Sequence, residues 1–175
     1  DEDIEKTGQV IEKTEELRRG LIQQLLTRGI GHTKFKETKI GQIPEGWRVA
    51  SLQTMLDEGL IVSHLDGNHG ELYPKSNEFV DTGVPYISAN CIEDGNVNLK
   101  KAKYLSPERA SKFIKGVALS GDVLFAHNAT VGPVAILDTE ERNVILSTTL
   151  TYYRCNENKL VPAYLRYFME SPLFS

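Results

Sequence analysis

Cysteine is scarce in this chain, and its placement excludes the most familiar cysteine chemistry. Among 175 residues there are only Cys91 and Cys155, with no CxxC motif and no nearby pair of histidines. A zinc site needs its ligands at close, regular spacing, and a structural disulfide needs an oxidising compartment that nothing else in the sequence indicates. We therefore expect no metal site, and we interpret the two cysteines as small, half-buried side chains in strands.

Long apolar runs are also missing. No run approaches the roughly 18 residues that span a bilayer, so we expect no membrane segment. The chain opens with Asp1, Glu2 and Asp3, whereas a secretory signal begins with positive charge. These features predict a cytoplasmic protein.

Motifs for catalysis are absent as well. The four histidines form no HExxH pattern, and the sequence contains no GxSxG, no P-loop and no dinucleotide fingerprint. The Asn/Asp-Pro-Pro-aromatic motif of adenine methyltransferases is missing too. The chain is therefore expected to be non-catalytic and to bind no cofactor itself.

Positive charge is in deficit overall but is concentrated in two segments. The net charge is −4, which does not by itself indicate a nucleic-acid binder. The first segment contains Arg28, Lys34, Lys36 and Lys39, and the second contains Lys100, Lys101, Lys103, Arg109, Lys112 and Lys115, with one glutamate in each. Such runs are usually solvated faces. The alternative is a surface that contacts DNA phosphates, for which Lys34, Lys36, Lys39, Lys100, Lys101 and Lys103 are the candidates.

Residues 1–29 are dominated by helix-forming residues and lack proline, which predicts one long helix of coiled-coil type over residues 4–28. Its apolar positions, at or near a seven-residue spacing, are Ile4, Ile11, Leu17, Leu21 and Leu25. A single helix cannot bury such a stripe, so the helix needs a partner helix.

Gly29 and Gly31 end this helix, and residues 30–46 are expected to form an extended basic linker. Residues 47–175 are expected to form a domain in which Trp47, Val49 and Leu52 turn into the core. Short strand-like segments separated by turns follow. A helix at 107–114 is capped by Ser106, and a last helix at 163–169 should turn its aromatic residues to the sheet. Without a βαβ rhythm, the fold class is α+β: a long helix followed by a mixed α/β domain with a twisted sheet and short helices.

Four polar loops, at residues 66–75, 88–90, 127–130 and 147–149, follow strand-like segments and carry side chains that can reach base edges. The candidates are Asn68, His69, Tyr73, Lys75, Ser88, Asn90, Asn128, Thr130, Thr148 and Thr149. Asparagine can bind adenine through two hydrogen bonds, and threonine can contact a thymine methyl group. For any one of these residues, hydrogen bonding within a turn is the commoner role.

Six segments occur in the order typical of one protein family. They are the Trp-containing segment 44–49, the glycine-bearing loop 66–75, Val-Pro-Tyr-Ile-Ser at 84–88, Lys-Gly with Gly-Asp-Val-Leu-Phe at 115–125, Thr-Val-Gly at 130–132, and the helix at 163–168. Preceded by the long helix, this order resembles the central region of Type I restriction–modification specificity subunits, a spacer helix followed by the second target-recognition domain.

The resemblance implies sequence-specific reading of one half of a bipartite target in double-stranded DNA. It implies spacer helices that pair antiparallel, within one specificity subunit or between two, and that dock methyltransferase subunits, which a restriction subunit joins. S-adenosylmethionine, ATP and magnesium would belong to those partners. Because this chain has one helix and one domain, we expect it to be a fragment whose domain stops before its last strands. Two other hypotheses stay open: an enzyme in its own right, and a protein-interaction module that does not read DNA.

Overall fold

The computed structural model describes residues 2–67, 73–127 and 132–174. Contacts divide the chain into a first unit that runs to Ala50 and a second unit, Ser51–Phe174, and each is described here by itself. No helix in the described ranges is both long and apolar enough to cross a membrane.

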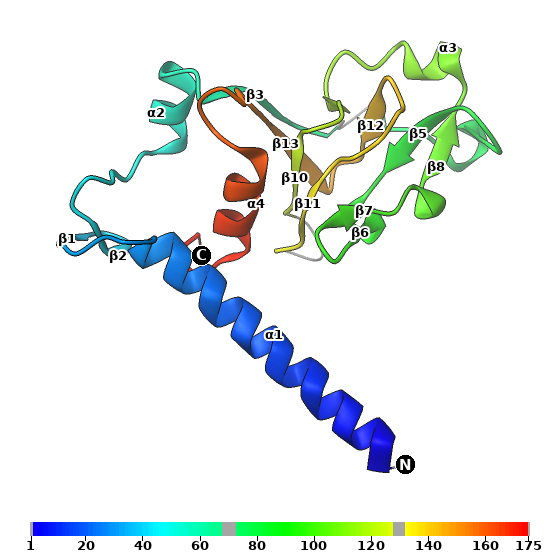
Figure 1. The fold of residues 1–175 in the computed structure, drawn as a ribbon. Coiled ribbons are helices and arrows are strands. Elements are labelled where there is room, and N and C mark those ends of the chain that lie inside the picture. The colour runs from blue at the N-terminus through cyan, green and yellow to red at the C-terminus, as the bar shows by residue number, and fades with distance from the viewer. Residues whose placement is uncertain (1, 68–72, 128–131, 175) are drawn as a thin grey trace. The chain divides into compact units, whose positions relative to one another are not determined.

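The first unit begins with the long helix α1, Glu2–Arg28, as the sequence predicted (Figure 1). Acidic residues in its first turn and Arg28 in its last turn complement the helix dipole. The helix ends at Gly29, whose φ of 62° is unfavourable for other residues and whose N–H donates to the Leu25 carbonyl at 3.1 Å. Leu26 is the buried residue of α1, so most of its apolar side chains lie exposed.

After α1 the chain forms a hairpin, which differs from the extended linker expected over residues 30–46. Strands β1, Phe35–Thr38, and β2, Gly41–Pro44, pair antiparallel. Trp47 packs edge-on against His32, with 5.6 Å between ring centroids, so it closes the first unit rather than opening the domain. Val49 and Leu52 are 47% and 38% exposed, so the expectation that they enter the core is wrong. Strands of four residues are too short to show a hydrophobic period.

The second unit begins with α2, Leu52–Asp57, capped by the Ser51 hydroxyl, and contains two sheets (Figure 1). In the described residues one sheet has the order β3-β13-β10-β11-β7-β6, and the other has the order β4-β8-β5-β12-β9. The strands of the first are β3 Ile61–Asp66, β6 Ile92–Glu93, β7 Asn96–Val97, β10 Val123–Ala126, β11 Val134–Ile136 and β13 Leu150–Cys155. Those of the second are β4 Phe79–Val80, β5 Val84–Ile87, β8 Lys103–Leu105, β9 Val117–Ala118 and β12 Val144–Leu146.

Short helical segments connect these strands. They are the 3₁₀ turns η2 Ser76–Glu78, η3 Ala89–Cys91 and η4 Leu99–Lys101, and the α-helices α3 Pro107–Ala110 and α4 Pro162–Glu170. The Ser106 hydroxyl accepts the Arg109 N–H at 3.1 Å, which confirms the predicted cap of α3, although that helix is shorter than expected. Helix α4 packs on β10 and β11. It buries Leu165 and Met169 while Tyr164 is 45% exposed, so aliphatic rather than aromatic residues make its main core contact.

The core consists of the central strands, whose runs of valine, leucine and isoleucine bury both faces. Leu124, Leu146 and Leu150 are fully buried in one cluster that joins the two sheets. Cys91 is buried and Cys155 is half-buried, and both are free thiols. Burial raises the pKa of both, that of Cys155 to about 11, so both thiols stay protonated at neutral pH and are poor nucleophiles. The α+β fold class is confirmed.

Candidate nucleic-acid interface

The four polar loops singled out in the sequence leave the sheets at one common edge. Strand β13 pairs antiparallel with both β3 and β10, so the ends of β3 and β10 flank the start of β13: Asp66 is opposite Thr151, and Ala126 is opposite Leu150. Strand β12 runs parallel to β5, so these two strands end together as well. Because β12 leads directly into β13, the ends of all four strands meet here.

The residues from 147 to 151, which we call the junction segment, bind the start of each loop through hydrogen bonds. The Leu150 carbonyl accepts the N–H of Gly67 at 2.8 Å, and the Thr149 carbonyl accepts the N–H of His127 at 3.2 Å. The Ser147 N–H donates to the carbonyl of Ile87 at 2.8 Å. The Thr149 hydroxyl accepts the N–H of Ala89 at 3.0 Å and lies 2.8 Å from the Ser147 hydroxyl. The loops therefore start from a fixed base.

An acidic and an imidazole side chain meet beside the junction segment. The Asp66 carboxylate accepts the Thr151 hydroxyl, and its Oδ1 lies 3.9 Å from Nε2 of His127. That nitrogen is buried and has no hydrogen-bond partner among the residues that the structure describes. At 3.9 Å the two groups form an ion pair only when the imidazole is protonated. No local sequence pattern marks this pair, because the two residues lie far apart in the chain.

The predicted base-reading residues fall into three groups. Ser88, Asn90, Thr148 and Thr149 come together around the junction segment, and the Ser88 hydroxyl donates to the Asn90 side chain at 2.5 Å. Tyr73 and Lys75 instead border a depression beside η2 and β8. Asn68, His69, Asn128 and Thr130 lie outside the described residues. Their role as readers stays a prediction.

The Thr149 hydroxyl differs from the other candidates because it is already used inside the protein, by Ala89 and Ser147. Asn90 by contrast is exposed, although its Oδ1 accepts from Ser88. An exposed amide whose orientation is fixed by a neighbour is well suited to contact a partner.

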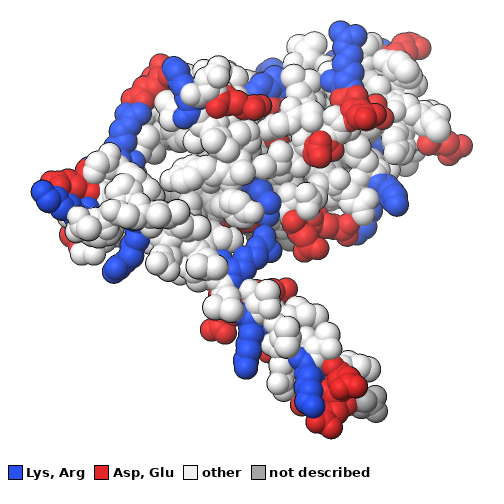
Figure 2. All heavy atoms as spheres, viewed as in Figure 1, with Lys and Arg blue, Asp and Glu red and all other residues white. Residues whose placement is uncertain are grey.

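The lysines predicted to contact phosphate lie on both units. Lys36 is on β1 and Lys34 and Lys39 flank that strand, in the first unit. Lys100 and Lys101 belong to η4, which packs on the η3 turn that carries Asn90. On the face shown in Figure 2, basic and acidic residues are interspersed, and no large patch of one sign is present.

Two of these lysines have defined side-chain contacts. Lys101 forms an ion pair with Glu93, which also accepts the Asn98 amide at 2.7 Å; these two bonds, Lys101 first, lower the pKa of the Glu93 carboxyl. Lys103 lies over the ring of Phe79, 4.8 Å from its centroid. A phosphate therefore competes with a carboxylate at Lys101 and with a ring face at Lys103.

Within the described ranges, no group of three or more histidine, cysteine or acidic side chains comes together. The buried carboxylate of Asp122 is held by hydrogen bonds within the protein. It accepts two bonds from Arg154, at 2.8 and 2.7 Å, and the N–H of Leu119 at 2.8 Å. This pair ties β13 to the turn before β10 and leaves no free acid there.

Curated proteins are similar to this chain in sequence. A protein described as the MjaX specificity subunit of a type I restriction enzyme, from Methanocaldococcus jannaschii, is 29% identical over 138 residues, which are 77% of this chain and 30% of that protein. The type I restriction enzyme MjaVIII specificity subunit from the same organism is 25% identical over 169 residues, or 94% of this chain and 37% of that protein. The chain thus spans about a third of the length of these relatives. No protein-family model matches it.

Solved structures share the fold. The crystal structure of the HsdS subunit from Thermoanaerobacter tengcongensis matches 97% of this chain and 37% of its own, with a TM-score of 0.58 and 20% identity. A chain from a structure titled for complex assembly and conformational transition of the type I R-M system matches 99% of this chain and 41% of its own, with a TM-score of 0.54 and 19% identity. Sequence and fold agree and confirm the resemblance seen in the sequence: this chain is similar in sequence to the specificity subunits of type I restriction–modification systems, and it shares the fold of the HsdS structure.

Proposed function

We propose that this chain is a DNA-recognition part of a type I restriction–modification complex in the cytoplasm, and that its second unit reads one half of a bipartite target. The observation that carries this proposal is that three polar loops start from the junction segment, which itself contains the fourth. A rigid base with polar loops is the arrangement by which a scaffold presents side chains to base edges in a groove.

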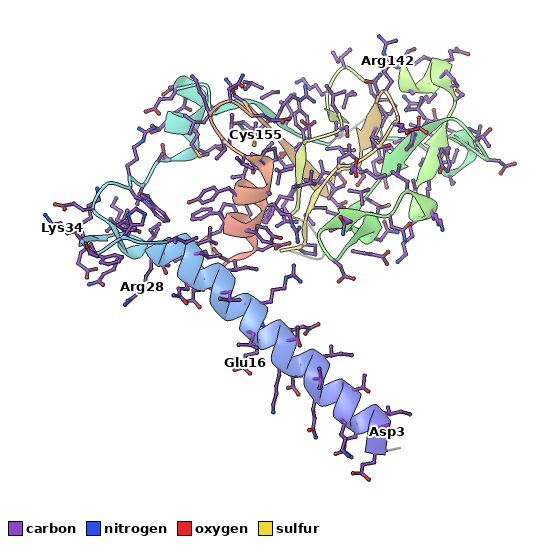
Figure 3. All side chains as sticks on the ribbon, in the orientation of Figure 1. Asp3, Glu16, Arg28, Lys34, Arg142 and Cys155 are labelled. Carbon is purple, nitrogen blue, oxygen red and sulfur yellow. The ribbon has the colours of Figure 1, made fainter. Side chains whose placement is uncertain are left out.

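The exposed face of α1 supports a second part of the proposal, the docking of partner subunits. Ile4, Ile11, Leu17, Leu21 and Leu25 are 75, 55, 68, 57 and 46% exposed. In Figure 3 the side chains of α1, from Asp3 through Glu16 to Arg28, stand out along the helix. A helix with such a stripe is stabilised by packing on another helix. The occupants we propose are methyltransferase subunits and a second spacer helix; a restriction subunit would join the assembled complex.

The chain itself is proposed to be non-catalytic. Methyl transfer and DNA cleavage would belong to the methyltransferase and restriction subunits, together with S-adenosylmethionine, ATP and magnesium. The contribution of this chain would be to position those subunits on one sequence.

One observation favours a different function, that of an assembly module without DNA reading. The net charge is −4, and acidic side chains accompany the basic ones, as Glu93 accompanies Lys101. Nonspecific DNA affinity is electrostatic, so a mixed surface weakens it. Direct measurement of sequence recognition separates these two functions.

The test is methylation mapping by single-molecule sequencing of a host that lacks other methyltransferases. The full-length parent gene is coexpressed with its methyltransferase, carrying either its own residues 66–75 or those of a relative with another target. We expect N6-methyladenine at a split motif, with one half altered by the exchange. A motif that is unchanged by exchanging this and each of the other three loops would favour the assembly module, and complete absence of methylation would contradict the proposal.

A further inference from the structure

A depression on the second unit combines aromatic and cationic side chains. It is lined by Tyr73, Lys75, Ser76, Asn77, Phe79 and Lys103. These residues come from the end of the 66–75 loop, from η2, from β4 and from β8, which pairs with β4. The sequence predicted Tyr73 and Lys75 to read bases and Lys103 to contact phosphate, whereas the fold places all three at one depression.

Aromatic rings form one side of this depression. Tyr73 is 52% exposed, and the Lys103 amine lies over the ring of Phe79, 4.8 Å from the ring centroid. Behind Phe79 lies the ring of Tyr86, at 5.4 Å between centroids. Apolar ring surface next to an amine suits a ligand that has both a flat or apolar part and a negative charge.

Tyr86 is a buried polar residue whose hydroxyl is unused. The residue is 5% exposed, and its hydroxyl has no hydrogen-bond partner in the part of the chain that the structure describes. Burial, and to a smaller extent the neighbouring Tyr73, raises the pKa of this phenol, so it stays protonated and can donate. Tyr86 does not line the depression, so it supports the Phe79 ring from the protein interior and does not itself contact a ligand there.

The backbone that carries Lys75 is held in place. The Glu78 carboxylate accepts the Lys75 N–H at 2.7 Å and the Arg109 guanidinium at 2.6 Å. The Glu78 N–H donates in turn to the Lys75 carbonyl at 3.0 Å. Arg109 is itself fixed over the ring of Phe113, 4.7 Å from its centroid. A lysine on such a rigid turn loses less conformational freedom when it binds a phosphate.

We propose that this depression is a subsite for one nucleotide step of a DNA strand, in which Lys75 and Lys103 bind the phosphodiester while Tyr73 and Phe79 contact the deoxyribose and base. The inference rests on the proposed function and refines it: Tyr73 and Lys75 grip the strand and do not read its sequence. A DNA strand fits better than a free nucleotide because the depression is lined by the end of the 66–75 loop, and that loop begins at the junction segment.

The test compares three forms of the full-length subunit in complex with its methyltransferase: wild type, Lys75→Gln with Lys103→Gln, and Lys112→Gln with Arg142→Gln. The last pair removes the same charge from exposed positions elsewhere on the second unit. Binding to the methylation target and to a scrambled duplex is measured from about 50 to 200 mM salt, and circular dichroism verifies folding. The slope of log K against log salt is negative, and loss of two phosphate contacts should make it shallower by about 1.8 on both duplexes. The control pair should leave the slope near that of wild type.

Tyrosine 73 gives an independent readout. Tyr73→Ala should weaken binding to both duplexes by a similar factor, and Tyr73→Phe, which keeps the ring, should retain most of the affinity. A salt slope for the Lys75/Lys103 pair that equals the control slope overturns the subsite, and so does altered target preference. Binding of a free deoxynucleoside monophosphate as tightly as the scrambled duplex also overturns it. If the wild-type complex binds the methylation target and the scrambled duplex equally well, the proposed function fails, and the inference fails with it.

Discussion

Gly67 packs directly against the carbonyl group of Ser147. A Cβ added at Gly67 would lie closer than 3.0 Å to backbone atoms of Ser147 and Leu146, a separation that real Cβ atoms essentially never show. The requirement for glycine is therefore steric. It arises where the 66–75 loop leaves β3 and crosses the junction segment, so this contact sets how closely two of the predicted recognition loops approach.

Gly67→Ala should destabilise the second unit by about 1–3 kcal/mol, because backbone atoms at the junction must move apart. Urea denaturation followed by fluorescence measures this change. Gly46→Ala is the matched control, since nothing lies within 4 Å of a Cβ at Gly46. Equal unfolding midpoints for the two variants would show that the junction segment is looser than described here.

Thr149 is expected to act by holding the junction together. Thr149→Val keeps the shape of the side chain but leaves the half-buried N–H of Ala89 without its acceptor, which should cost about 1–3 kcal/mol. Thr149→Ser retains the hydroxyl and should lose much less. If Thr149→Val is as stable as wild type but changes the methylated motif, Thr149 is a base reader and the sequence-based assignment was right.

Arg154 neutralises the buried Asp122 carboxylate, which is 1% exposed as a residue. Arg154→Met should destabilise the second unit by about 3 kcal/mol, the lower end for removal of one partner from a buried pair, because the arginine is partly exposed. Adding Asp122→Asn should recover part of the loss, since it removes the unpaired charge. Urea unfolding of the two single variants and the double variant gives the coupling free energy; additive effects would contradict this arrangement.

The sequence predicted the helix α1 and the cap of α3, since each depends on local signals such as a glycine after the helix or a capping serine. The convergence of the four loops could not be predicted. It depends on the pairing of β13 with β3 and β10, and no local pattern records pairing between distant strands.

Side-chain contacts between distant residues were missed for the same reason. Glu78 and Arg109, or Asp66 and His127, carry no common motif, and only the fold brings them together. The first hairpin shows the opposite difficulty. Its signals are local, but Phe35 and Ile43 supply too few apolar residues to mark two four-residue strands.

Acid should weaken the second unit partly through Glu78. Its bond from the Lys75 N–H, and then its bond from Arg109, lower the pKa of this carboxyl below the ordinary value of 4.5. The folded state therefore binds fewer protons than the unfolded state in this range. Its contribution to stability is complete above pH 4.5 and is lost as the pH falls from there through the lowered pKa.

Glu78→Gln removes this titration. The difference in unfolding free energy between wild type and Glu78→Gln should therefore be largest near about pH 6 and shrink toward about pH 3. Glu108→Gln, which changes an exposed glutamate on α3, serves as the control and should give a smaller difference at both values. A difference between wild type and Glu78→Gln that does not depend on pH would mean that the carboxylate bonds to Lys75 and Arg109 do not persist in solution.

Leu21→Asp combined with Leu25→Asp should abolish docking of α1 to its partner helix or subunit while the second unit stays folded. Both leucines are exposed in the chain alone, at 57 and 46%, so their replacement removes little packing within it. In a complex, each new aspartate would bury an unpaired charge in an apolar interface, which is strongly unfavourable.

Gln9→Asp with Gln23→Asp is the control. It adds the same charge on the opposite face of the same helix, as the period of 3.6 residues places it. Co-purification with the methyltransferase and circular dichroism should show loss of the complex, with retained folding, for the leucine pair only. Equal retention by both pairs would locate docking away from this stripe, and equal loss would indicate that added charge disrupts the helix itself.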